Sequence, residues 1–252
     1  MQPETLVDQY CPQSHTAPVT GAAFDAESGA CVTADATGAV AITRPGDNYP
    51  AIVFAMDGPV NGAVAVVRGG SLVAIGDDTG SVAVYNTWDG SCVFEDLREG
   101  GAGEARAMRA LTFNPSGTVL ASLSVDGIIR IFDIQRWERI ANYQGFGGES
   151  LSFDDSGERL LAIDTLGQPK LLDLLSHEQI DLEMVPGGVR MACFTPDYRK
   201  VITMGQGGIS IIELPSGRIE SSFTARGSSG MHAIVIHPDG HELGAITGRS
   251  IH

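Results

Sequence analysis

The chain has 252 residues and a formal net charge of −15 at pH 7, and its only lysines are Lys170 and Lys200. Phosphate backbones are bound by clustered lysine and arginine, so this composition argues against nucleic acid as the partner. The sequence has no apolar run long enough to span a membrane and no signal-peptide pattern at its start. Four dispersed cysteines without a Cys-x-x-Cys motif favour a reducing, cytoplasmic compartment over disulfides or zinc.

In chain order, the first strand-like segment is Thr5–Tyr10, which precedes the regular part of the sequence. A glycine followed by a short apolar stretch then returns at steps of 42, 47, 40, 41 and 40 residues. The recurring glycines are Gly38, Gly80, Gly127, Gly167, Gly208 and Gly248. An apolar strand is predicted upstream of each glycine, ending near Phe24, Val66, Phe113, Phe153, Phe194 and Ile236. Repetition at this period indicates similar units arranged in a stack or a ring.

The third repeat shows one unit most clearly. Its apolar runs RALTF, VLASLS, IIRIFDI and RIANYQ are separated by the turn segments NPSG, VDG and QRWE. Short apolar runs bounded by turn residues are typical of strands, and proline and glycine favour the turns between them. We find no segment with the apolar period of a capped helix. Each unit is therefore predicted to be a four-stranded antiparallel meander, whose two apolar faces require neighbouring units to cover them.

This pattern resembles the WD40 family of β-propellers over nearly the whole chain. The stretch ASLSVDGIIRIFD matches the family's second strand, turn and third strand, with Phe132-Asp133 where Trp-Asp usually stands. His15-Thr16 followed by VTGAAF matches the histidine-containing loop that begins a repeat. Only the third repeat keeps the turn aspartate, Asp126, so the family's buried His–Asp–Ser/Thr–Trp network is expected to be incomplete everywhere, with apolar packing in its place. The resemblance implies an all-β fold, with residues 1–252 forming one propeller of six four-stranded antiparallel blades.

The sixth repeat stops after the segments MHAIVIH and ELGAIT and the beginning of a third strand at residues 249–252. Propellers of this family commonly close by pairing an N-terminal outer strand with the last blade. We therefore expect residues 5–10 to lie antiparallel to residues 249–252, which covers an otherwise unpaired edge. The alternatives are a ring completed by a partner's strand and a longer native chain.

Two surface features each allow two interpretations. The segment Glu95–Ala107 accounts for the 47-residue step and is either a tolerated loop insertion or a binding loop. Trp88 and Trp137 both occupy the connection between the third and fourth strands of a repeat. Each indole either covers the edge between neighbouring blades or is an exposed anchor for a partner.

Candidate catalytic and metal groups are weak. His237, Asp239 and His241 form an HPDGH cluster, which is interpreted as a turn equivalent to NPSG rather than as a metal site. Asp77-Asp78 fall in a turn and are expected to face solvent. The glycine-rich GFGG and GQGG stretches lack the helix or lysine that a phosphate-binding loop needs. We therefore expect no enzymatic activity, no metal and no cofactor.

The predicted function is that of a non-enzymatic scaffold or adaptor that presents a propeller face to a protein or peptide within a larger assembly. The candidate contact residues are Arg106, Arg109, Tyr143, Phe146, Glu149, Arg190 and His232. The alternative is a small-molecule or carbohydrate site in the central channel, because propellers also host enzymes. Such a site needs convergent polar groups, and Arg109, Glu149, Arg190 and His232 near one channel mouth lack a nucleophile and a paired acid and base. The sequence does not name the partner or the oligomeric state.

Overall fold

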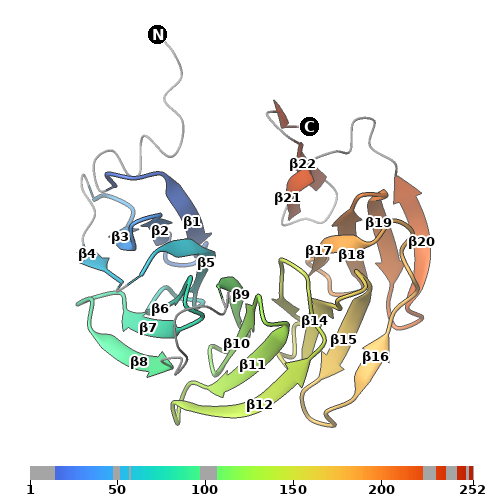
Figure 1. Ribbon diagram of the computed structural model, residues 1–252, viewed down its shortest axis with the longest axis horizontal. Coiled ribbons are helices and arrows are strands. Elements are labelled where there is room, and N and C mark those ends of the chain that lie inside the picture. Colours follow the sequence, from blue (N-terminus) through green and yellow to red (C-terminus); the bar gives the residue numbers. More distant parts are fainter. Residues whose placement is uncertain are drawn as a thin grey trace. The chain divides into compact units, whose positions relative to one another are not determined.

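A computed structural model describes residues 15–47, 52–56, 58–96, 107–223, 231–236, 243–247 and 250–251. Within these ranges the chain forms only strands, turns and bends, so none of them contains a helix that could cross a membrane. The chain divides into two compact units, residues 1–142 and 143–252, and each is described by itself (Figure 1).

Unit 1 contains three four-stranded sheets, each an antiparallel meander in sequence order. The first is β1 (Val19–Phe24), β2 (Cys31–Asp35), β3 (Ala39–Thr43) and β4 (Ile52–Ala55). The second is β5 (Val60–Val66), β6 (Leu72–Asp77), β7 (Val82–Asn86) and β8 (Cys92–Asp96). The third is β9 (Met108–Phe113), β10 (Val119–Ser124), β11 (Ile128–Asp133) and β12 (Glu138–Gln144), of which the last two residues belong to unit 2. Strand β8 extends through Asp96, so the predicted surface loop begins later than expected, and residues 97–106 lie outside the described part of the chain.

Unit 2 contains two four-stranded sheets and one of three strands. The four-stranded sheets are β13 (Ser152–Phe153), β14 (Arg159–Ile163), β15 (Pro169–Asp173) and β16 (Gln179–Asp181), followed by β17 (Val189–Phe194), β18 (Lys200–Gly205), β19 (Gly208–Glu213) and β20 (Arg218–Phe223). The third consists of β21 (Met231–Ile236), β22 (Leu243–Thr247) and β23 (Ser250–Ile251).

These sheets confirm an all-β chain of repeated antiparallel meanders, with five four-stranded sheets where six were expected. The last sheet has three strands in the described part of the chain, as the early stop of the sixth repeat predicted. Residues 5–10 lie outside the described residues, so the closed six-bladed ring stays a prediction.

The repeat glycines mark the turn between the second and third strands. Gly38 has a φ of 91° and Gly208 a φ of 113°, a left-handed region that L-residues with a side chain rarely occupy. The first strand of a sheet also shows a register shift near its beginning, for example between Val19 and Gly21. The same irregularity recurs in the sheets that begin with β5, β9, β17 and β21. The recurrence of both features shows that the repeats share backbone geometry as well as sequence.

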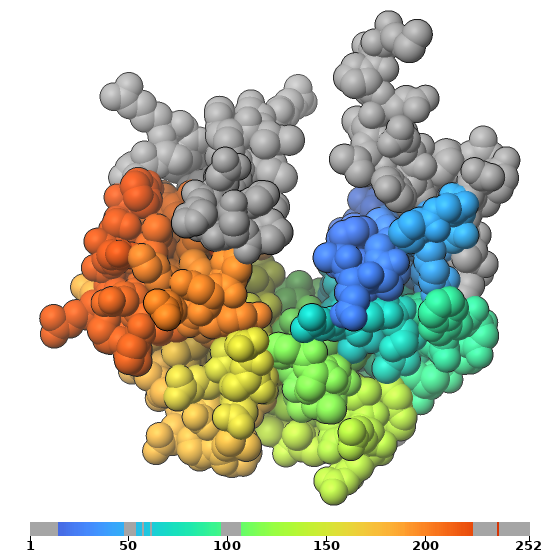
Figure 2. All heavy atoms as spheres, turned by 180° about the vertical axis from the view of Figure 1, so that it is seen from behind, coloured from blue at the N-terminus to red at the C-terminus, as the bar shows by residue number. Residues whose placement is uncertain are grey.

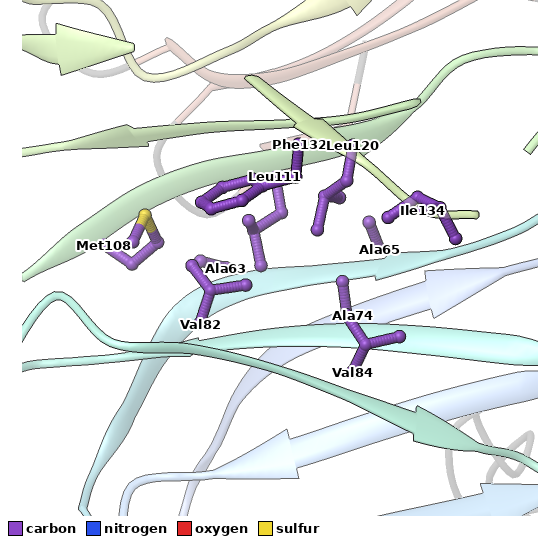
Figure 3. Packing of buried hydrophobic residues seen from close by; sticks show 10 residues of the cluster. All are labelled: Ala63, Ala65, Ala74, Val82, Val84, Met108, Leu111, Leu120, Phe132 and Ile134. Atoms are coloured by element: carbon purple, nitrogen blue, oxygen red, sulfur yellow. The ribbon is translucent and has the colours of Figure 1, made fainter. Parts of the chain in front are cut away.

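The second and third sheets of unit 1 bury a core of complementary side-chain sizes (Figure 3). The second sheet contributes small residues, Ala63, Ala65, Ala74, Val82 and Val84, and the third contributes Met108, Leu111, Leu120, Phe132 and the following Ile134. Phe132, which stands where the WD40 pattern has tryptophan, is fully buried in this core. The fit is tight enough that a Cβ on Gly76 would lie 2.3 Å from Cγ of Met108.

The first two sheets of unit 2 bury a second core. It contains Leu161, Ile163 and Leu171 from one sheet, Val189, Ala192, Phe194, Val201 and Ile212 from the other, and Leu182 and Val185 from the segment that joins them. In Figure 2 the residues of unit 1 run from blue to yellow-green, and those of the first two sheets of unit 2 from yellow to orange. In unit 1 the second and third sheets, and in unit 2 the first two sheets, therefore cover each other's apolar faces, because a meander cannot bury both faces by itself.

Candidate functional site

Two of the predicted contact residues, Glu149 and Arg190, meet in unit 2. Arg190 Nη2 lies 2.5 Å from Glu149 Oε1, and both side chains are about half exposed. The backbone N–H of Glu149 also donates to the carbonyl of Arg190 at 2.9 Å. Both residues stand at the beginning of a repeat, 41 residues apart in sequence. The repeat register therefore places a solvent-facing ion pair on neighbouring sheets.

Ser150 fixes the backbone under this ion pair. Its hydroxyl accepts from the N–H of Ala192 at 2.8 Å and donates to the carbonyl of Ala192 at 3.1 Å. Glu149 through its backbone and Ser150 through its side chain thus bond to β17 of the next sheet, and β13 contains only Ser152 and Phe153. The ion pair is held on a backbone that joins two sheets.

We call the end of a sheet where its first strand begins the entry end. In an antiparallel meander the second and third strands are joined at this end, and the fourth strand finishes there. Glu149 and Arg190 lie at the entry ends of the first two sheets of unit 2, together with the turn between β14 and β15 and the segment that follows β16.

Tyr143 and Phe146 are buried, which corrects the expectation that they face a partner. The hydroxyl of Tyr143 lies 3.0 Å from Nδ1 of His177, and burial raises the pKa of Tyr143 above its usual value, with a further contribution from the charge of Asp173. Phe146 forms a β-bridge with Asp164 and packs inside unit 2. Apolar ring area favours the interior once neighbouring strands can cover it, so neither residue belongs to the candidate surface.

The structure describes the side chain of only one of the three remaining predicted contact residues, Arg109. Arg109 is partly buried on β9 of unit 1. The backbone of His232 lies in β21, but its side chain is outside the described residues, as is all of Arg106. Two predictions about other residues also fall there, the HPDGH cluster and most of the segment from Glu95 to Ala107. Among the described side chains no group of three or more His, Cys, Asp or Glu could hold a metal ion.

Sequence reasoning missed a set of aspartates that organise the entry end. They lie three residues before the repeat glycine, and one carboxylate oxygen of each accepts from the N–H groups two and four residues further on. Asp35 accepts from Thr37 at 2.9 Å and from Ala39 at 3.1 Å. Asp77 accepts from Thr79 and from Ser81, both at 2.9 Å. Asp164 accepts from Leu166 at 2.8 Å and from Gln168 at 2.9 Å. Asp77 is buried, which corrects the expectation that it faces solvent. The sequence could have revealed these aspartates, because each stands three residues before its repeat glycine.

The first sheet contains a buried polar network that was expected to be replaced by apolar packing. Nδ1 of His15 lies 3.1 Å from Asp35 Oδ2, and Nε2 of the same ring lies 2.8 Å from the hydroxyl of Thr33. Burial alone raises the pKa of Asp35, but hydrogen bonds from Thr37, His15 and Ala39 outweigh it and lower the pKa to about 2. Histidine, aspartate and threonine therefore cooperate here without a tryptophan.

In the third sheet an arginine side chain binds the aspartate of the turn between β10 and β11. Arg130 is buried, and its guanidinium donates to Asp126 Oδ2 at 2.8 Å and to the hydroxyl of Ser124 at 2.7 Å. Ser122 stands five residues before its repeat glycine, as Thr33 does in the first sheet. Its buried hydroxyl has no hydrogen-bond partner in the structure described. A buried arginine thus satisfies the turn aspartate in the repeat that most resembles the family.

The two tryptophans differ in exposure. Trp137 stacks on Phe94 of the preceding sheet with ring centroids 5.4 Å apart, as expected of an indole that covers the edge between neighbouring sheets. Trp88 is exposed, and the guanidinium carbon of Arg44 from the preceding sheet lies 4.2 Å from its ring centroid. Arg44 Nη2 also donates to the carbonyl of Thr87 at 2.6 Å. Both indoles contact the sheet before their own.

A family model described as "WD domain, G-beta repeat" matches residues 101–133. No curated protein matches the chain. The matched range contains β9, β10 and β11, including the buried Phe132 and the Asp126 turn. The same strand order recurs in the other sheets of both units. The recognition from the sequence is confirmed at this repeat: residues 101–133 are a WD40 repeat, and the chain is consistent with the WD40 family.

Proposed function

We propose that this protein is a non-enzymatic interaction module that holds a protein or peptide partner at the entry ends of its sheets. Propeller-like folds built from WD40 repeats generally mediate protein interactions, which supports the class of function. The observation that supports the location is the Glu149–Arg190 pair, because its two charges are about half exposed and fixed by backbone hydrogen bonds. A preorganised charged pair lowers the ordering cost of binding and favours a partner with complementary charges.

In unit 2 the proposed contact surface consists of Glu149 and Arg190, and in unit 1 Arg109 stays a separate candidate contact residue. We further propose six blades closed by residues 5–10, a cytoplasmic location, and no direct role in binding nucleic acid or membranes. The strongly acidic composition supports the proposal that the protein does not bind nucleic acid or anionic membranes. The alternative of a small-molecule or carbohydrate site stays a prediction, and no contact among the described residues favours it.

The test compares partner capture from the native source by the parent chain and by variants with alanine at Arg109 and Arg190. We expect these variants to lose capture while their thermal midpoints stay within about one or two degrees of the parent, as for surface changes below ~0.5 kcal/mol. Arg159→Ala is the matched control for Arg190→Ala, because Arg159 is as exposed as Arg190 and pairs with Asp173 at 3.8 Å at the opposite end of its sheet.

A charge swap separates recognition from structure. The double variant Glu149→Arg with Arg190→Glu keeps an ion pair on the same backbone but reverses its polarity. It is expected to fold as the parent does and to lose the partner. Capture that survives both the alanine variants and the swap, with normal folding, would remove this surface from consideration.

A further inference from the structure

The entry end of the β13–β16 sheet carries two of the most exposed apolar side chains in the described part of the chain. Leu166, in the turn between β14 and β15, is 80% exposed, and Met184, in the segment after β16, is 71% exposed. A flexible loop exposes apolar side chains at little structural cost, so the significance of this pair depends on how firmly its backbone is held.

The turn that carries Leu166 is held by Asp164. The carboxylate of Asp164 accepts from the N–H of Leu166 at 2.8 Å and from the N–H of Gln168 at 2.9 Å, and its carbonyl accepts from Gly167 at 3.0 Å. These bonds fix the backbone on both sides of Leu166. Its side chain projects into solvent from a closed turn.

The segment that carries Met184 is held just as firmly. Leu182 and Val185 are buried, so the chain is anchored on both sides of Met184. Between them, the N–H of Glu183 donates to the carbonyl of Gly217 at 2.7 Å, and its carboxylate accepts from the N–H of Ile219 at 2.6 Å. Glu183 therefore ties this segment to the edge strand β20, and Met184 remains as its outward-facing apolar group.

Hydrogen bonds also tie the turn and the segment to each other. The side-chain oxygen of Gln168 accepts from the N–H of Val185 at 2.9 Å, and the carbonyl of Gly167 accepts from the N–H of Val189 at 2.8 Å. The two backbones are so close that a Cβ on Gly167 would lie 3.2 Å from Cα of Gly188. Leu166 and Met184 are consequently displayed from one rigid platform, and binding to them requires no further ordering of the backbone.

The ionic groups of this platform are mostly acidic. Lys170 is the cation, and it lies between Asp164 at 3.8 Å and Asp181, which its ammonium contacts directly. Asp181 is largely exposed, and the carboxylate of Glu183 adds a further negative charge beside Met184. Two carboxylates therefore flank one ammonium that is already paired, and the segment that carries Met184 adds the carboxylate of Glu183, in a chain whose net charge is −15.

We propose that Leu166 and Met184 form a docking site for a short cationic peptide segment with apolar side chains, which we call the Leu166–Met184 platform. The peptide's apolar groups cover the leucine and the methionine, and its arginine or lysine side chains meet Asp181 and Glu183. Methionine adapts to varied apolar shapes, so the platform accepts a class of peptides rather than one sequence. This inference deepens the proposed interaction function and rests on it.

The probe is a fluorescent peptide of alternating leucine and arginine, measured by anisotropy against the full chain. Alternating leucine–glutamate and serine–arginine peptides of the same length are the comparisons. The parent is expected to bind the leucine–arginine peptide at least about tenfold more tightly than either comparison. Raising the salt concentration should weaken binding, because charges at the surface are screened beyond about 8 Å at physiological ionic strength.

The decisive variant is Leu166→Ser with Met184→Ser, which is expected to weaken binding by about tenfold or more. Leu175→Ser is the matched control, because Leu175 is also 71% exposed but lies in the turn at the opposite end of the same sheet. Gln168→Ala is expected to weaken binding to a smaller degree without removing either apolar group, because it removes one of the two hydrogen bonds that tie the turn to the segment. Circular dichroism and thermal midpoints establish that each variant is folded.

Equal binding by the double serine variant, an equal loss in Leu175→Ser, or equal binding of the leucine–glutamate peptide would each overturn the proposal. So would a concentration-dependent dimer of the parent that the double variant abolishes, since the occupant would then be a second copy of this chain. Failure here is distinguishable from failure of the proposed function. Partner capture that depends on Arg190 but not on Leu166 and Met184 keeps the function and rejects this platform.

Discussion

The buried carboxylate of Asp35 makes the most quantitative prediction. In Asp35→Asn the charge is removed while the side chain keeps nearly the same size. The parent carboxylate accepts from Thr37 and Ala39 and lies against His15, and these bonds hold its pKa at about 2, below the ordinary 3.8. A pKa unit corresponds to about 1.4 kcal/mol, so ionised Asp35 contributes about 2–3 kcal/mol to the stability of unit 1.

The sign of the pH dependence follows from the depressed pKa. The contribution of Asp35 is fully present above the unfolded value of about 3.8 and is lost as the pH falls through the folded value of about 2. The stability difference between parent and Asp35→Asn should therefore be largest near neutral pH and shrink steadily between about pH 5 and pH 2. Asp35→Asn is thus expected to lower the free energy of unfolding most near neutral pH.

Urea unfolding followed by tryptophan fluorescence is a suitable assay, because both tryptophans, Trp88 and Trp137, lie in unit 1 with Asp35. Asp89→Asn is the control, since Asp89 accepts from the N–H and hydroxyl of Ser91 in a similar turn that is exposed to solvent. Its effect should be clearly smaller. A stability difference for Asp35→Asn that does not change with pH, or one no larger than that of Asp89→Asn, would refute the reasoning.

Three further predictions concern packing, reactivity and closure. Gly76→Ala should destabilise unit 1 by about 1–3 kcal/mol in urea unfolding, because the new Cβ lies 2.3 Å from Met108 Cγ and 2.6 Å from Met108 Cβ; a variant as stable as the parent would contradict this. Iodoacetamide should modify the exposed Cys92 faster than Cys193 in the native chain, since burial raises the pKa of Cys193 to about 11; equal rates by mass spectrometry would contradict this. Deleting residues 1–12 should lower stability and solubility if residues 5–10 close the last sheet, and a deletion variant as stable as the parent would reject closure by this segment.

Much of the fold could be predicted from the sequence because its determinants are local. The recurring glycine predicts a left-handed turn, and Gly38 and Gly208 have it. Short apolar runs between turn residues predict strands, and the four runs of the third repeat became β9, β10, β11 and β12. The proximity of Glu149 and Arg190 also followed, since equivalent positions of neighbouring repeats lie side by side once the period is known.

The parts that could not be predicted depend on which neighbour covers which side chain. Tyr143 and Phe146 are aromatic residues of the kind that binding surfaces often contain, but neighbouring parts of the structure bury them. The role of Asp35, Asp77 and Asp164 was missed because the family places its aspartate nearer the repeat glycine, and the hydrogen bonds they accept depend on backbone directions in the turn. An arginine such as Arg130 is usually expected at the solvent-exposed surface. The packing of the third sheet instead buries it and pairs it with Asp126.

The sequence by itself determined the all-β class, the period, the turns and the WD40 resemblance, because glycine conformation and apolar alternation act within one repeat. Only the tertiary structure decided which polar groups are satisfied internally and which side chains remain for a partner, because that choice depends on contacts between residues far apart in the chain. Gln168 illustrates the difference. Nothing in its local sequence distinguishes it, yet its side chain joins the backbones that display Leu166 and Met184.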